Sequence, residues 1–314
     1  MKFAPLASRN IKTYSIKTRK GKVNVKDLAS VPRKGGSLRD FLTSLPSMLA
    51  ANDLKAVTTA VVRAHGGKKT VALAIGAHVI KAGLSPLIID LMERGVIGAI
   101  ATNGAGAVHD FELAFAGSTS EDVDAGIGSG EFGMADETGR FLNDAIKKGV
   151  EKGFGIGQSV GGMIEGSRFP YKDLSILAAG ARLDIPVTVH VAIGTDIIHV
   201  HPRMDGSSTG RGSHRDFRIF SSVVSSLEGG VFINIGSAVI LPEVFLKALT
   251  LARNLGYKVR NFTSVNMDFI QHYRPVTNVV RRPTMRGGKG YALTGHHEIM
   301  VPLLYAGIIE GLES

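Results

Sequence analysis

The sequence predicts an α/β protein with a Rossmann-like parallel sheet and helices on both faces of that sheet. Short apolar runs, such as Thr70–Ile75 and Val96–Thr102, alternate along the chain with segments that have helical patterns. This alternation is typical of βαβ units, in which each helix returns the chain to the start of the next parallel strand. The 39 glycines and an aromatic content of only 6% fit tight turns between closely packed strands and helices.

The expected elements begin after a breaker-rich joint at Val31–Gly36. Ser37 is the predicted N-cap of a helix that continues to Leu45, and Ser85-Pro86 begins a helix that ends near Arg94. The other expected helices are Asp110–Ala116, Leu174–Ala181, Phe217–Leu227 and Pro242–Leu255, and the other expected strands are Pro186–Ala192, Gly230–Ile235 and Lys258–Val265. Right-handed crossovers between such strands place a ligand at their carboxyl ends.

Two long stretches have neither pattern. Gly117–Gly139 is rich in glycine and acidic residues, and His199–Arg215 is polar. We expect both to be loops, and loops of this length inside a compact domain are usually functional or mobile.

The positive charge of the chain is concentrated at its beginning. Residues 1–40 hold eleven Lys and Arg against Asp27 and Asp40, which accounts for most of the net charge of +10. We therefore divide the chain into a basic arm, residues 1–36, and a single α/β nucleotide-binding domain, residues 37–314. Such an arm can bind phosphates or pack on a neighbouring subunit. Nucleic acid is not the favoured partner, because no recognition-helix or aromatic-stacking pattern accompanies the arm.

Several classes of protein are excluded by composition. The chain has no cysteine, which rules out a disulfide scaffold, a zinc ribbon and thiol catalysis. No apolar stretch is long enough to span a membrane, and residues 1–12 lack the apolar core of a signal peptide. We expect a cytoplasmic protein without a membrane partner.

Two glycine-containing turns follow buried strands. The first is Asn103–Gly106, before the helix near Asp110, and the second is Asn234–Ser237, before the helix at Pro242. Glycines at such turns let backbone amides approach a phosphate, and the dipole of the following helix favours the negative charge. The first turn lacks the third glycine of the usual dinucleotide fingerprint, so its spacing alone does not identify a dinucleotide site.

Three segments with these turns carry a family resemblance. Ile75–Gly83, Ile100–Asp110, and Asp184–Pro186 leading to Thr195-Asp196 resemble the deoxyhypusine synthase family in order and spacing. The resemblance continues through Gly229–Ile240 and ends at 301–304, so it covers most of residues 55–310. It implies a homotetramer that binds NAD near subunit interfaces. In that family the enzyme oxidises spermidine with NAD and passes the aminobutyl group to a lysine of a translation factor.

The resemblance also implies which residues contact the cofactor. By position they are His78, Thr102, Asn103, Gly104, His109, Asp196, Gly236, Thr263 and Ser264. His109 stands where the family has a glutamate that suits ribose hydroxyls, so this contact differs from the family pattern.

The chain departs from the family where the catalytic lysine is expected. After Arg274-Pro275 it continues as Val276–Pro283, with no lysine at that place, and Lys289 lies several residues further on. The family's substrate-binding histidine is also missing, and Glu243 is the nearest polar replacement. A covalent imine needs a neutral amine, and arginine stays protonated, so authentic deoxyhypusine synthesis is not expected.

The second half of the chain supplies the candidate catalytic and substrate-binding residues. Residues 269–297 contain no acidic side chain, so they favour an anionic group, whereas the acidic stretch Gly117–Gly139 keeps a cationic substrate possible. The candidate substrate-binding residues are Asp205, His272, Arg274, Arg281, Arg282 and Lys289. The candidate catalytic residues are Asp196, His199, His201 and Glu243, with Asp196 and one of the two histidines as an acid–base pair.

His199-Val200-His201 would place two imidazoles on one side of an extended segment, as metal sites often require. These two histidines are the candidate metal ligands, although we expect a polar pocket without metal.

The leading hypothesis is a deoxyhypusine synthase-like enzyme that binds NAD. It would act on a small amine- or carboxylate-bearing substrate by hydride or proton transfer. One alternative is a metal-dependent hydrolase or lyase that uses His199 and His201. The other is a non-enzymatic, nucleic-acid-associated subunit that uses the basic arm.

Overall fold

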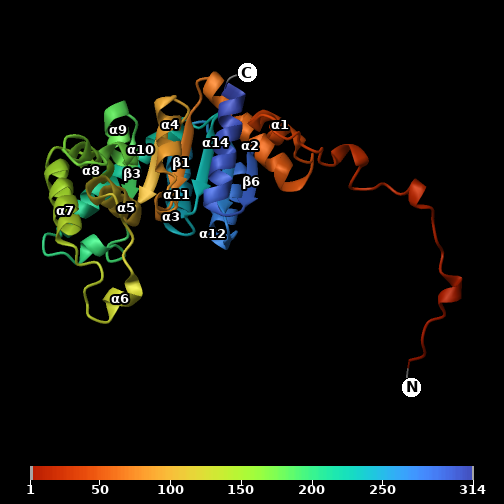
Figure 1. Ribbon diagram of the computed structural model, residues 1–314, viewed down its shortest axis with the longest axis horizontal. Helices are drawn as coiled ribbons and strands as arrows, with labels where there is room; N and C mark the ends of the chain where they lie inside the picture. Colours follow the sequence, from red (N-terminus) through yellow and green to blue (C-terminus); the bar gives the residue numbers. More distant parts are fainter. Residues whose placement is uncertain (1–2, 313–314) are drawn as a thin grey trace.

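The computed structural model describes residues 3–312 and contains one six-stranded, fully parallel sheet (Figure 1). The strand order is β3-β2-β1-β4-β5-β6, which is the doubly wound order of Rossmann folds. The predicted fold class is therefore confirmed. The strands are β1 (Val71–Ile75), β2 (Ala99–Asn103), β3 (Val187–His190), β4 (Val231–Ile235), β5 (Thr263–Asp268) and β6 (Lys289–Thr294).

The two faces of the sheet carry side chains of different size. Val71, Leu73 and Ile75 of β1 belong to the larger core cluster, whereas Ala72 and Ala74 belong to the other. Successive residues of a strand point to opposite faces, so β1 is buried on both sides and its whole sequence is apolar. The alanine face leaves room for the phenylalanine side chains that fill the second core.

The helices cover both faces. The longest are α2 (Leu49–Gly66), α5 (Gly104–Ala116), α7 (Asp136–Glu151), α10 (Gly206–Ser225), α11 (Ile240–Asn254) and α14 (His297–Leu312). The shorter ones are α1 (Leu38–Ser44), α3 (Ala77–Lys81), α4 (Ser85–Glu93), α6 (Val123–Ile127), α8 (Ile156–Glu165), α9 (Ile176–Leu183), α12 (Tyr273–Pro275) and α13 (Arg282–Thr284). A π-helical turn, η6 (Val276–Arg281), joins α12 to α13, and 3₁₀ turns occur at η4 (Lys172–Leu174) and η5 (Ile197–His199).

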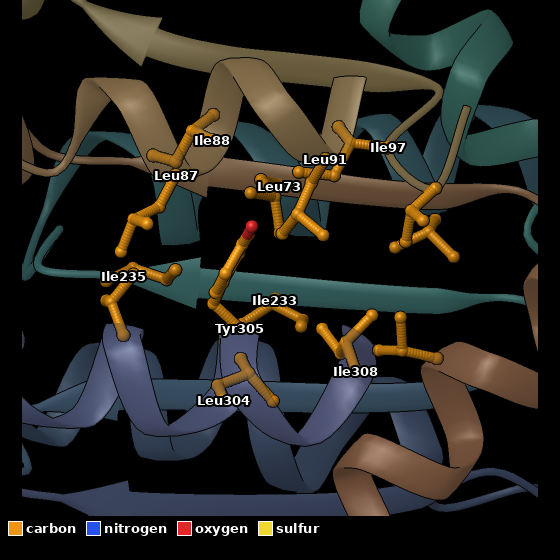
Figure 2. A pocket seen from close by; sticks show the side chains of 14 residues that line it. Leu73, Leu87, Ile88, Leu91, Ile97, Ile233, Ile235, Leu304, Tyr305 and Ile308 are labelled. Atoms are coloured by element: carbon orange, nitrogen blue, oxygen red, sulfur yellow. The ribbon is translucent and has the colours of Figure 1, made fainter. Parts of the chain in front are cut away.

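The larger core lies between the sheet and the helices α4 and α14. Figure 2 shows Leu73 and Ile233 of the sheet facing Leu91 of α4 and Ile308 of α14. The void among these side chains is about 20 Å³ and almost entirely apolar, so it is a packing gap that excludes a ligand. Tyr305 is the polar exception, and its hydroxyl donates to Asp90 Oδ2 at 2.9 Å.

The two stretches expected to be loops are partly helical, which corrects that prediction. α10 begins at Gly206, inside 199–215, because the Asp205 side chain accepts from the N–H groups of Ser207 and Ser208 and caps the helix. The acidic stretch contains α6 and the start of α7. β5 also begins later than expected, at Thr263, because its first residue pairs with Val231 of β4.

The arm has little regular structure. Residues 3–36 contain three 3₁₀ turns, η1 (Ser8–Asn10), η2 (Ile16–Thr18) and η3 (Val25–Asp27), and nearly all of its residues are exposed. In Figure 1 the arm leaves the body beside α1 and α2, on the side of the molecule away from α7 and α8. Across residues 3–312, no helix combines the length and the apolar character needed to cross a bilayer.

Candidate functional site

The carboxyl ends of β1 and β4 meet where the strand order reverses direction. In doubly wound sheets this switch point opens the crevice that holds the ligand. His78 follows β1 and Gly236 follows β4, so the structure brings these two predicted cofactor residues to the same edge.

The backbones of the two turns are in contact. The Gly76 N–H donates to the carbonyl of Ile235 at 2.8 Å, and a Cβ at Gly76 would overlap the carbonyl oxygen of Gly236. Gly236 has a φ of +65°, the left-handed region that favours glycine. A side chain at either position would therefore separate the turns or strain them.

A short run of backbone N–H groups follows Gly236. The N–H groups of Ala238, Val239 and Ile240 donate to no other residue within 3–312. They precede α11, whose N-cap residue Val239 offers no side-chain acceptor and is half-exposed. Free N–H groups at a helix start attract anions, and the helix dipole adds to that attraction. This segment can therefore hold a phosphate.

His297, at the start of α14, lies directly beside Gly236. A Cβ at Gly236 would come within 2.8 Å of His297 Cε1, so the glycine makes room for the ring. The imidazole is 1% exposed, and neither of its nitrogens has a hydrogen-bond partner. A buried unsatisfied imidazole is costly, and such groups are concentrated at functional sites.

The surroundings of His297 favour its neutral form. Burial lowers the pKa of His297, although the Asp268 carboxylate, whose Oδ1 lies 3.6 Å from Nε2, acts in the opposite direction. His78 is the other ring at this edge, with 5.6 Å between the ring centroids. A neutral imidazole beside a carboxylate can accept a proton from a substrate.

The first glycine turn, after β2, does not form the predicted phosphate site. The Asn103 side chain accepts from Gly106 N–H at 2.8 Å and caps α5, and the Thr102 hydroxyl donates to Ile75 O at 3.0 Å. The Asp196 carboxylate lies against Gly104, where a Cβ would overlap its Oδ2. A carboxylate of the chain itself thus occupies the start of α5, so an added phosphate would be repelled.

Asp196 and His199 lie together but do not form the expected hydrogen-bonded pair. His199 Nδ1 accepts from the N–H groups of Gly194 and Asp196, both at 3.1 Å, so the ring proton belongs on Nε2. Nδ1 is 4.0 Å from Asp196 Oδ2, and that oxygen and His199 Nε2 are both buried without partners. Burial raises the pKa of Asp196.

His201 is separated from this pair. Its Nδ1 accepts from Arg203 N–H, and its Nε2 lies 3.6 Å from Asp136 Oδ1. Residues 197–199 form the turn η5 instead of an extended segment, so the two imidazoles do not face one ligand. No group of three potential ligand side chains that could hold a metal occurs among residues 3–312. Metal ligation by His199 and His201 is therefore not supported.

A cavity of about 250 Å³ lies between α5, the acidic stretch and the segment that leads into η5, and its lining combines charged and apolar side chains. His109 and Asp196, both predicted cofactor residues, line it together with Lys81, Glu112 and Glu121. His109 Nδ1 is 2.6 Å from the Thr119 hydroxyl, which donates to Glu112 Oε2. The cavity adjoins the carboxyl edge and offers groups of both charges to a small substrate.

Glu243 is held in a network at the start of α11. It pairs with Lys247, lies 3.5 Å from Arg274 Nε, and accepts from Asn278 Nδ2 at 2.8 Å. The Lys247 hydrogen bond keeps the pKa of Glu243 low. Glu243 therefore remains a carboxylate that positions Arg274, which reduces its value as an acid. Asp205 likewise serves as the α10 cap.

The remaining predicted residues are divided between the two edges of the sheet. His272 and Arg274 follow β5 at the carboxyl edge. Thr263, Ser264 and Lys289 lie at the starts of β5 and β6, at the amino edge, opposite His78 and Gly236. The structure therefore does not bring these three residues together with His78 and Gly236. Arg281 ends η6 and Arg282 begins α13. η6 returns toward the amino edge, where Val279 O accepts from Ser264 Oγ.

Neither Asp268 nor His297 is among the site residues predicted from the sequence. Their positions relative to the strands could have identified them, because Asp268 ends β5 and His297 follows β6, at the same edge of the sheet as Gly236. β6 itself was not predicted, so this position could not be recognised.

No family model matches the sequence, and no curated protein is significantly similar to it. Solved structures are similar in fold. A protein from Methanococcus maripaludis S2 described as a conserved LOR/SDH protein matches with a TM-score of 0.53 and 18% identity, over 85% of this chain and 71% of that one. An arginine dihydrolase of the ornithine–ammonia cycle in cyanobacteria gives a TM-score of 0.53 and 14% identity over 85% of this chain.

The chain spans about one third, 34%, of the length of that dihydrolase. A protein from Entamoeba histolytica described as a deoxyhypusine synthase aligns over 88% of this chain and 94% of its own, with 12% identity and a TM-score of 0.49. At such identities a likeness shows the fold alone. The two structures with TM-scores of 0.53 agree with the parallel α/β architecture that the sequence predicts.

Proposed function

We propose that the chain is an NAD-binding enzyme that acts on a small amine- or carboxylate-bearing substrate at the switch point between β1 and β4. The observation that carries this proposal is the run of free N–H groups at 238–240, beside the close approach of Gly76 and Gly236. A dinucleotide needs both a backbone that approaches closely and donors for its pyrophosphate.

The residues after β4 fit the pyrophosphate of NAD better than the residues after β2 do. At the start of α11 the Ser237 hydroxyl accepts from Leu241 N–H at 3.3 Å, but no residue within 3–312 accepts from the N–H groups of 238–240, whereas Asn103 and Asp196 occupy the start of α5. When bound, NAD supplies a hydride acceptor. His297 and Asp268 would hold or release the proton that accompanies hydride transfer, and the cavity lined by His109 and Asp196 would hold the substrate.

The proposal does not include an imine on a lysine at the place where the deoxyhypusine synthase family keeps its catalytic lysine. Lys289 lies at the start of β6, at the opposite edge from His297, so it cannot replace the missing family lysine at this site. The residues after Arg274-Pro275 form the π turn η6 and offer no other amine.

A homotetramer remains part of the proposal. Phe269, Ile270 and Tyr273 are 47%, 51% and 74% exposed next to the site, and exposed apolar side chains that gather in this way fit a neighbouring subunit. Light scattering of the purified chain tests this expectation, and a monomer at working concentrations would contradict it.

NAD binding is tested by calorimetry on V239D. The new carboxylate would stand among the free N–H groups, where it repels a pyrophosphate, and we expect binding to weaken by about tenfold or more. The dipole of α11 favours a carboxylate at this end of the helix, so we expect V239D to stay folded, and thermal unfolding of the variant checks that weaker binding does not come from unfolding.

The matched control is L255D. Leu255 is 65% exposed at the other end of the same helix, so this variant makes the same charge change away from the site. We expect it to bind NAD like the unchanged chain. Absence of NAD binding in the unchanged chain, or equal affinities in the two variants, would refute the proposal.

A further inference from the structure

A second cleft opens at the amino edge of the sheet, opposite the proposed cofactor site. It has a volume of about 440 Å³ and is lined by α2 and by the segments that lead into β4, β5 and β6. This volume lies in the range of small-ligand sites, which is about 300–1,000 Å³. Arg63 and Lys289 line the cleft, and no carboxylate does.

The loops around this cleft are strongly basic. The segments 67–70, 226–230, 255–262 and 285–289 lead into four neighbouring strands, β1, β4, β5 and β6. They contain six exposed cations and one carboxylate, Glu228. The cations are Lys68, Lys69, Lys258, Arg260, Arg286 and Lys289.

Glu228 does little to neutralise this charge, because it is engaged within its own loops. Its carboxylate accepts from the N–H groups of Arg260 and Asn261, at 2.6 and 3.0 Å, and from Asn261 Nδ2 at 2.9 Å. Arg63 and Lys289 form no ion pair with any residue within 3–312. Their charges are therefore available to a ligand.

The positive charge of these loops also lowers the pKa of the Arg253 guanidinium. Burial lowers the pKa of Arg253, and the charges of Arg286 and Arg260 lower it further. The Arg253 guanidinium is held by backbone carbonyls of Val259 and Pro283, at 2.7–2.9 Å, and not by a carboxylate. An isolated protein gains nothing from such repulsion, whereas an anionic ligand would offset it.

We propose that this amino-edge cleft is a second binding site, which takes a phosphorylated small molecule between Arg63 and Lys289. Two cations that line the same cleft suit the several oxygens of a phosphate group, and Thr263 in the cleft lining can contact the rest of the ligand. The site is separate from the proposed cofactor site, since it lies at the other ends of the same strands.

Pyrophosphate is the probe, and its binding is measured by calorimetry in the V239D chain, so that an anion at the carboxyl edge does not contribute. We expect binding that weakens at least about tenfold in R63Q/K289Q. The matched control is R211Q/R218Q, which removes the same charge from exposed positions of α10 outside the cleft and should leave the affinity within about twofold.

The outcomes separate this inference from the proposed function. Loss of pyrophosphate binding in R63Q/K289Q alone supports the second site, whether or not the chain binds NAD. No pyrophosphate binding in the V239D chain, or equal weakening in both double variants, overturns it. Binding of single-stranded RNA without binding of pyrophosphate would also overturn it, in favour of a nucleic-acid surface.

Discussion

Replacing Asp216 with asparagine should remove a large pH dependence of stability. Asp216 lies on α10, and its Oδ2 accepts from the N–H groups of Gly157 and Val189 at 3.0 and 2.8 Å, so it links α8 and β3 to α10. Its side chain is buried, and burial raises its pKa from 3.8 to about 7 despite these hydrogen bonds.

The sign of the effect follows from proton binding. The folded state binds this proton more tightly than the unfolded state, so the stabilisation is complete below pH 4 and is lost as the pH rises through about 7. A difference of about three pH units corresponds to about 4 kcal/mol in the free energy of unfolding. In D216N the amide oxygen can still accept from both N–H groups, but nothing titrates at this position.

The assay is urea unfolding of both chains at several pH values between 4 and 8. Asp110, whose pKa burial raises to about 6, also titrates in this range, so only the difference between the two chains isolates Asp216. We expect the unchanged chain to lose up to about 4 kcal/mol relative to D216N as the pH rises. Parallel stability curves, or a relative gain for the unchanged chain, would refute the reasoning.

Two further predictions concern the site and a buried histidine. G236A should destabilise the chain by about 1–3 kcal/mol, because alanine is strained at a φ of +65° and its Cβ would press on His297. The control is G83A. Gly83 has a φ of +76° and open space around it, so alanine there adds only the backbone strain. Equal losses of stability in thermal unfolding would contradict the contact with His297. His190 is buried, which lowers its pKa to about 3, so its stabilisation is complete above pH 6.5 and is lost as the pH falls toward 3. In urea unfolding between pH 4 and 7, H190Q should therefore lose less stability than the unchanged chain as the pH falls. An equal loss of stability in the two chains would contradict this role of His190.

Central elements of the fold were predictable from local patterns. Thr70–Ile75 and Gly230–Ile235 are apolar throughout because β1 and β4 are buried on both faces, and this property is visible in the sequence. Ser37 forms the predicted N-cap of α1, with Asp40 completing a capping box. β6 was missed because it is an edge strand, mostly exposed, in which Leu293 is the one buried residue, so it shows no long apolar run.

The candidate site was predictable only in part. His78 and Gly236 follow strands that the sequence reveals, so their place at the carboxyl edge could be derived. Thr263 and Ser264 were expected at the end of a strand at Lys258–Val265, but they begin β5 and so lie at the opposite edge. A shift of a few residues along a strand is decided by pairing with its neighbour, here Thr263 with Val231, and no local pattern encodes it.

The sequence by itself determined the alternation of strands and helices, the glycine turns and the basic arm, because each of these depends on residues that are close together in the chain. Only the tertiary structure decided which turn is free to hold an anion. Asp196 comes ninety-two residues after Gly104, yet its carboxylate lies against that glycine, whereas the N–H groups after Gly236 have no partner within 3–312. Packing across the sheet sets such long-range contacts, and they favour the turn after β4 over the turn after β2, although the sequence offered both for the phosphates of the cofactor.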